Sequence, residues 1–471
     1  MRKSDSRARS LGLFAGRLAS GYLAFGGFHG NVIPVADLRE EEPDNSAVAE
    51  VLADVRKKDC VPWNEASEQL WNTWLEHLHR RGVTALRILP RRNTDGDVLD
   101  LCGKINQRLL NLMERFFAAA QPYGIRFLLV LMPEPDQSGY LRKEFLKKWV
   151  GPAYTKSEIA KMSAAQRRFV GQQRAVSLAD YFTDADVWAC QRLYLDGLCE
   201  WIKKRPEIFA LEIVNQQGWD NNRFHWDVEE AMVAWGIRVA EYAHKRAPNL
   251  PLSFSHAGFG ILGYEPLRWS RETPVDFYST HLCAGQIGER PGMDIGLVTD
   301  VVINYCSAVK PAFVGEWGIP SDKVNAGLRK LALRDAIWFS ILDGSPGLFQ
   351  GPNATHYGFE YKKAREILDP LKLDQKERMR PFVGVDVTRT AAALAATDLY
   401  GAGKADARKL VPKKAQGAAY SDLLRCCEFF LNNGVPFDFT LAPDEYEIAT
   451  VPARIHELQL PESACVLSFS R

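Results

Sequence analysis

The chain has 471 residues, of which 46% are hydrophobic and 11% aromatic, which predicts a well-filled globular core and excludes a disordered protein. Its 59 basic and 58 acidic residues nearly cancel, so charge favours neither nucleic acid nor an acidic membrane surface as a partner. The nine cysteines show neither metal-ligand spacing nor a disulfide framework, and no phosphate-binding or cofactor-binding motif is present. We therefore predict no metal, no cofactor, no nucleic acid and no membrane as partners.

Residues 1–20 form a basic N-terminal extension whose apolar part is too short for a secretory signal. No apolar run reaches the roughly 20 residues that a membrane-spanning helix needs. We expect a soluble protein, with the cytoplasm slightly favoured as its location.

From about residue 20 to 370, apolar runs alternate with amphipathic helical stretches, which is typical of repeated βα units around a parallel sheet. The predicted strands are residues 22–28, 82–89, 125–132, the apolar start of 211–219, 252–255, 275–281, 312–315 and 347–350. Helices are expected at residues 65–80, 97–121, 184–204, 227–246 and 325–342. Eight such strands predict an α/β fold in which residues 21–370 form a (β/α)₈ barrel.

A long insertion at about residues 133–179 is rich in Lys, Arg, Gln and aromatic residues. It leaves the third strand at its carboxyl end, the face of such barrels where active sites lie. We interpret it as a lid or a substrate-shaping subdomain. A surface excursion without function is the alternative.

The composition changes at residues 368–380, a charged stretch that reads as a linker to a small α/β domain at 381–471. Strands are expected there at 382–386, 435–441 and 464–468, with a helix at 420–432. This tail loosely resembles part of the flavodoxin-like domain that follows the barrel in family 42 beta-galactosidases. It is short for a complete doubly wound sheet, so it is either an incomplete domain or one that leans on the barrel or on another subunit, as in a homo-oligomer.

Two short segments carry the functional signal: LEIVNQQGW at residues 211–219 and FVGEWG at residues 313–318. Each reads as a buried strand that ends at polar side chains, and about 100 residues, room for about three βα units, separate the two ends. The pair resembles the strand-four Asn-Glu and the strand-seven Glu of clan A glycoside hydrolases, most closely family 5. The resemblance implies a retaining beta-glycoside hydrolase on a TIM barrel that acts on an oligosaccharide or beta-glycoside, with Glu316 as the nucleophile.

Three further positions match the family. Arg87 corresponds to the strand-two Arg and would keep Glu316 ionised by its opposite charge. Asn215 corresponds to the Asn that hydrogen-bonds the sugar 2-hydroxyl, and His281 corresponds to the strand-six His. The aromatic rings of Trp219 and Trp317 lie close to the predicted strand ends and could stack on sugar rings.

Other positions around the expected active site differ from the family. The Tyr expected two residues after the strand-six His is Cys283, and Tyr278 stands three residues upstream of that His, where strand alternation should point it the other way. The family's strand-three His and strand-eight Trp are not apparent. Glu212 lies four residues before the acid/base position, which favours a structural ion pair below the barrel mouth.

The departure with the largest consequence is Gln216, which occupies the acid/base position although an amide neither gives nor takes a proton at neutral pH. Three explanations stay open: an engineered replacement of a glutamate, a natural Gln that serves a self-leaving aglycone as in plant myrosinases, and loss of catalysis. The last makes the protein a non-catalytic glycan-binding pseudoglycosidase. An unrelated TIM-barrel enzyme with coincidental motifs is a third class of function.

Overall fold

In the computed structural model, the residues described are 25–29, 32–34, 60–62, 65–88, 107–132, 157, 160, 178–215, 229–256, 272–283, 310–318, 337, 347–350, 362–363, 366, 383–386, 418, 421–422, 425–430, 437–440 and 448–459. The statements that follow concern these residues. The predicted insertion at 133–179 lies almost wholly outside them, so its interpretation as a lid stays a prediction.

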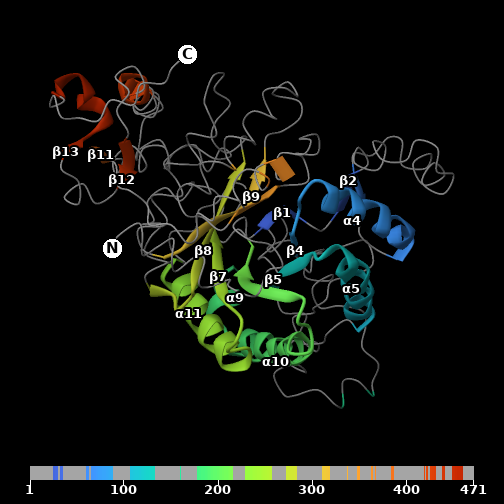
Figure 1. Cartoon of the computed structure of the whole chain (residues 1–471). Helices are drawn as coiled ribbons and strands as arrows, with labels where there is room; N and C mark the ends of the chain where they lie inside the picture. The colour runs from blue at the N-terminus through green and yellow to red at the C-terminus, as the bar shows by residue number, and fades with distance from the viewer. Residues whose placement is uncertain are drawn as a thin grey trace.

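Eight parallel strands form a closed barrel, in which the last strand returns to pair with the first (Figure 1). In barrel order they are β1 (Phe25–His29), β4 (Ala85–Ile88), β5 (Arg126–Met132), β6 (Ile208–Val214), β7 (Leu252–His256), β8 (Phe277–Cys283), β9 (Ala312–Gly318) and β10 (Gly347–Gln350). All eight fall on the predicted strands, and the (β/α)₈ fold class is confirmed. The carboxyl ends of these strands therefore share one mouth of the barrel.

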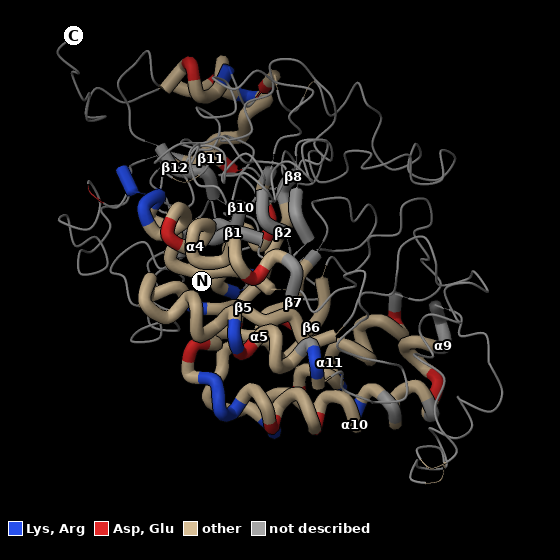
Figure 2. The backbone as a smooth tube through the Cα atoms, turned by 90° about the vertical axis from the view of Figure 1, so that its right-hand side faces the viewer, with Lys and Arg blue, Asp and Glu red and all other residues tan. Residues whose placement is uncertain are grey.

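Helices lie outside the strands, as Figure 1 shows for α5, α10 and α11. The helical segments are η1 (Glu65–Leu70), α4 (Trp71–Arg80), α5 (Gln107–Ala120), η2 (Gln121–Tyr123), α9 (Leu178–Thr183), α10 (Ala185–Ile202) and α11 (Glu229–Arg246). In Figure 2 the residues coloured as charged lie mostly on these helices and their turns, and few lie on the coloured parts of the strands. This is the division expected when one face of each helix packs on a buried sheet.

The interior of the barrel is filled by apolar side chains near the amino ends of the strands. Ala85, Leu128, Ala210, Phe277 and Phe313 belong to one buried cluster, in which the rings of the two phenylalanines are 5.1 Å apart. Because these positions face inward, strand alternation also turns Arg87, Glu212 and Ser279 toward the barrel axis, two residues further along their strands. Buried polar residues thus form a layer above the apolar one.

Outside the barrel, α4 buries Trp71, Trp74, Leu75 and Leu78 on one face, at the helical spacing that predicted it. The predicted helix 65–80 begins as the 3₁₀ segment η1. The predicted helix 97–121 is described from Gln107 as α5, and its first ten predicted residues lie outside the described residues. A short antiparallel pair, β2 (Val32–Pro34) with β3 (Cys60–Pro62), was not predicted. Three-residue strands are too short to show a hydrophobic period.

The tail contains a separate sheet of three parallel strands in the order β12-β11-β13. Strands β11 (Val383–Asp386) and β12 (Phe437–Thr440) were predicted, whereas β13 (Ile448–Thr450) was not, and the strand expected at 464–468 lies outside the described residues. The order 2-1-3 is that of the first three strands in a flavodoxin-like doubly wound sheet. That residues 381–471 form a separate small α/β domain stays a prediction.

Among the described helices, none has both the length and the apolar character that crossing a bilayer requires.

Candidate active site

Glu316 lies near the carboxyl end of β9, and a β-bulge brings it to the inner face. The pairing of β8 with β9 matches Thr280 to Val314 but then His281 to Glu316, so that Gly315 is an extra residue on β9. An added Cβ at Gly315 would overlap the Ser279 hydroxyl and lie 2.9 Å from His281 Nε2. A side chain at position 315 would therefore displace the Ser279 hydroxyl and the His281 ring, which lie beside Glu316.

Arg87 of β4 is fully buried and joins three polar side chains from two other strands. Its Nε donates to Glu212 Oε2 at 3.3 Å and its Nη2 also bonds Glu212, which makes a two-pronged ion pair. Nη2 further donates to Asn215 Oδ1 at 2.6 Å, and Nη1 lies 3.8 Å from Glu316 Oε2. Arg87 thus bridges the end of β6 and the end of β9.

Two carboxylates lie near Arg87, but the one expected from the sequence, Glu316, makes the weaker contact. Glu212, which was expected in a structural ion pair, makes hydrogen-bonded contacts with the guanidinium, whereas the separation of 3.8 Å from Glu316 is beyond hydrogen-bond length. Glu212 is fully buried and needs this cation. Arg87 therefore stabilises the fold through its ion pair with Glu212. It influences Glu316 through the electrostatic field of its charge and not through a hydrogen bond.

His281 of β8 flanks Glu316 on the other side, with Nδ1 3.6 Å from Glu316 Oε2. Both His281 and Arg87 are fully buried, whereas the Glu316 side chain is 17% exposed. Of the side chains gathered around Arg87, Glu316 is accordingly the one that solvent or a ligand can reach. The Arg87 guanidinium is the permanent positive charge beside Glu316, whereas His281 adds a charge only when it is protonated.

Asn215 follows the last residue of β6 and is 3% exposed. Because its Oδ1 accepts a hydrogen bond from Arg87, the orientation of the amide is set by the same guanidinium that faces Glu316. The structure therefore brings together Arg87, Asn215, His281 and Glu316, four of the residues singled out from the sequence. The contact of Asn215 with a sugar hydroxyl stays a prediction.

The remaining candidates divide into two groups. Gln216 and Trp219 lie outside the described residues, so their positions relative to Glu316 stay predictions. Tyr278 is buried, and strand alternation places it on the opposite face of β8 from Ser279, away from Glu316. Trp317 is also fully buried, and in this structure its ring presents no exposed face to a sugar.

Sequence reasoning missed the serines that fasten the strand ends below the site. Ser255 Oγ donates to the Val214 carbonyl at 2.7 Å and Ser253 Oγ donates to the Leu211 carbonyl at 3.3 Å. These bonds tie β7 to the segment of β6 that leads into Asn215. The signal was available, because two serines alternate with apolar residues along β7.

A cysteine nucleophile is a chemical alternative that can be tested on the described thiols. Burial raises the pKa of Cys199 on α10 to about 12, with Asp196 adding to the effect. The pKa of Cys426 is also raised to about 12, chiefly by burial. Both thiols are therefore protonated at neutral pH and inert as nucleophiles.

No family model and no curated protein matches this sequence. Among solved structures, a variant of GH5_18 from Streptomyces cattleya in complex with Manb1-4GlcNAc is similar with a TM-score of 0.53 and 14% identity, over 84% of this chain and 96% of that one. GH5_18 from the same organism in complex with GlcNAc gives a TM-score of 0.51 and 14% identity, over 83% and 96% of the two chains. At this identity the likeness shows the fold, which is the TIM barrel of family 5 glycoside hydrolases.

Proposed function

We propose that this protein is a retaining beta-glycoside hydrolase in which Glu316 is the nucleophile and Gln216 occupies the acid/base position. One observation carries the proposal. The carboxylate of Glu316 is partly exposed at the carboxyl end of the barrel, while a buried guanidinium and a buried imidazole flank it at 3.8 and 3.6 Å. The barrel mouth is where catalytic groups of this fold reside.

The chemistry assigned to Glu316 is attack of one carboxylate oxygen on the anomeric carbon, with departure of the aglycone oxygen and formation of a glycosyl ester. Water then attacks the same carbon, releases the sugar and regenerates the carboxylate. Arg87 and His281 keep Glu316 oriented and ionised for the first step. Asn215, oriented by Arg87, is the donor assigned to the sugar 2-hydroxyl.

Gln216 sets the substrate range. Without a proton donor, the first step lacks the rate enhancement of about 10²- to 10⁴-fold that general acid catalysis supplies, unless the aglycone leaves without protonation. Glycosides with good leaving groups are therefore the proposed substrates. The complexes of GH5_18 with Manb1-4GlcNAc and with GlcNAc support an oligosaccharide as the ligand of this fold.

The test is trapping of the glycosyl-enzyme. The protein is incubated with 2-deoxy-2-fluoro glycosides of glucose, mannose and galactose that carry a dinitrophenyl leaving group, and its intact mass is measured. We expect one adduct, which peptide mapping places on Glu316, and no adduct on the matched Glu316→Gln variant. An unmodified wild-type protein with all three sugars, or an adduct on another residue, would remove the nucleophile assignment.

A non-catalytic glycan-binding pseudoglycosidase is the second candidate, because Gln216 and Cys283 replace a Glu and a Tyr of the catalytic family. Azide with an aryl glycoside separates the two candidates. A functional nucleophile forms the glycosyl-enzyme and azide then releases it as a glycosyl azide, so turnover rises with azide concentration. Oligosaccharide binding by calorimetry without any azide-dependent turnover would favour the pseudoglycosidase.

A further inference from the structure

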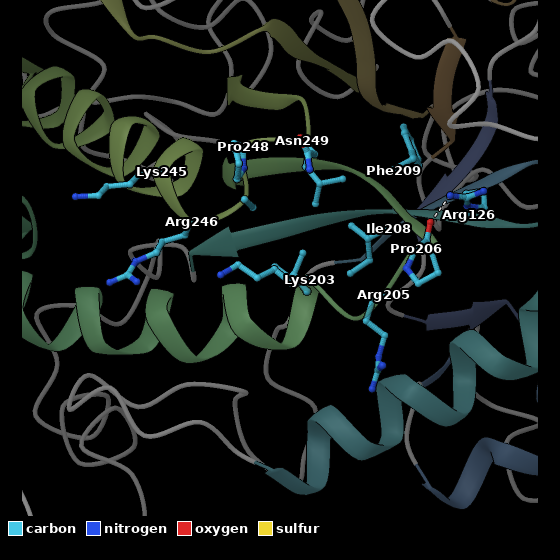
Figure 3. A pocket seen from close by; sticks show the side chains of 13 residues that line it. Arg126, Lys203, Arg205, Pro206, Ile208, Phe209, Lys245, Arg246, Pro248 and Asn249 are labelled. Atoms are coloured by element: carbon cyan, nitrogen blue, oxygen red, sulfur yellow. Dashed lines mark hydrogen bonds between the residues drawn. The ribbon is translucent and has the colours of Figure 1, made fainter.

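A cavity of about 640 Å³ lies at the opposite end of the barrel from Glu316, where the chain enters the strands. Its wall is built by the start of β5, by the turn between α10 and β6, and by the turn between α11 and β7 (Figure 3). The volume is within the range of about 300–1,000 Å³ that small-molecule sites occupy. Nothing in the proposed hydrolase uses this end of the molecule.

The polar lining of the cavity is cationic. Five of its side chains are basic, and none of the described residues that line it is acidic; the five are Arg126, Lys203, Arg205, Lys245 and Arg246. Figure 3 shows that they come from all three segments of the wall. Three guanidinium groups are included, and these suit two-pronged binding of oxyanions.

Three of the five basic side chains form ion pairs with carboxylates. Arg246 Nη2 lies 2.7 Å from Asp196 Oδ1, Lys203 Nζ lies 2.5 Å from Glu200 Oε1, and Arg205 pairs with Glu114. The carboxyl ends of α10 and α11 also carry partial negative charge that basic residues balance. However, none of these carboxylates lines the cavity, so the charged residues of its lining are all cationic.

Some N–H groups of the lining arginines lack a hydrogen-bond acceptor among the described residues. Arg205 and Arg246 each have a buried Nε–H without a hydrogen-bond acceptor among the described residues, and the nearest carboxylate oxygen to Arg205 Nε, from Glu207, is 3.9 Å away. Lys245 makes no ion pair within the described part of the chain. Burial lowers the pKa of Arg126, whose hydrogen bonds go to backbone carbonyls, from Nε to Glu207 at 3.2 Å and from Nη2 to Pro206. An anion in the cavity would offset this burial cost.

Apart from Asn249, the rest of the wall is apolar; Ile202, Ile208 and Phe209 are almost wholly buried in it, and Leu250 is partly exposed. We propose that the cavity binds a small phosphorylated organic anion, with its phosphates on the basic side chains and its organic part against this apolar wall. Inorganic phosphate alone would fill only a small part of the volume. The site is separate from the catalytic mouth, so its occupation does not depend on the proposed hydrolase activity.

The test is titration calorimetry of the full chain in about 50 mM salt with ATP as the probe, beside tripolyphosphate and adenosine. We expect saturable binding of ATP at one site, weaker binding of tripolyphosphate and no binding of adenosine alone. The double variant Lys203→Gln with Lys245→Gln should weaken ATP about 10-fold, because it removes two lining cations. Lys204→Gln is the matched control, since Lys204 is exposed in the same turn but does not line the cavity.

Equal loss of affinity in Lys204→Gln and in the double variant would show a diffuse surface charge and overturn the site. Absence of saturable ATP binding to the wild-type protein would overturn it as well. If tripolyphosphate and ATP bound equally, the role of the apolar wall would be wrong. Both lysines of the double variant are exposed, and thermal melts of the three proteins confirm that any loss is not unfolding.

Discussion

Removal of the Arg87 side chain tests whether this residue supports the fold, the proposed role of Glu316 or both. In the variant Arg87→Met, Glu212 remains fully buried with its charge uncompensated. Removing one partner of a buried pair costs about 3–5 kcal/mol of unfolding free energy, whereas replacing both partners with apolar residues is often nearly neutral. We therefore expect Arg87→Met to lose about 3–5 kcal/mol, and the double variant with Glu212→Met to recover most of that loss.

Urea denaturation measures the free energies of unfolding of the wild-type protein and of both variants. A loss below about 1 kcal/mol, or a double variant no more stable than the single one, would refute the ion-pair reasoning.

The same pair of proteins separates stability from function. Glu316 loses the cation 3.8 Å away in both variants, so formation of the fluorosugar adduct should be slowed in the double variant although its stability is restored. Full recovery of the trapping rate with stability would show that Arg87 acts on the site only through the fold.

Three further outcomes are expected. Gly315→Ala should lower the unfolding free energy by about 1–3 kcal/mol and abolish trapping on Glu316, because the added Cβ overlaps the Ser279 hydroxyl. An unchanged melting temperature together with an unchanged trapping rate would contradict the close approach at the bulge. Gln216→Glu should raise turnover of an unactivated glycoside about 10²- to 10⁴-fold while changing that of a dinitrophenyl glycoside far less, and no gain would count against position 216 as the acid/base site. Cys199 should resist iodoacetamide at pH 8 in the folded protein and react in urea, because burial raises the pKa of its thiol to about 12, and peptide mass measurement reports the difference.

The arrangement of the barrel could be predicted from sequence because strand signals are local. The apolar run before Asn215 and the one around Phe313 each contain enough β-forming residues to identify a strand, and β10 was predicted with its observed bounds. Polar residues at the ends of such strands then converge at one mouth as a consequence of parallel closure. The meeting of Arg87 with Glu316 follows from that geometry.

Details of the site were less predictable. From the sequence Arg87 was assigned to Glu316 alone, whereas in the structure its hydrogen-bonded carboxylate is Glu212, because contacts between strands depend on packing that the sequence does not show. The strand β13 was missed since three residues carry no period, and its place beside β11 depends on a contact between segments more than sixty residues apart.

Local apolar runs and their spacing by themselves determined the α/β class, the eight strands and the identity of the carboxylate at the end of β9. Only the tertiary structure decided that Arg87 is shared between Glu212, Asn215 and Glu316, and that Gly315 forms the bulge that turns Glu316 inward. The physical reason is that a strand is specified by neighbours along the chain, whereas charge pairing depends on distances of a few ångströms between strands. Those distances are set by barrel closure and packing, which involve residues far apart in sequence.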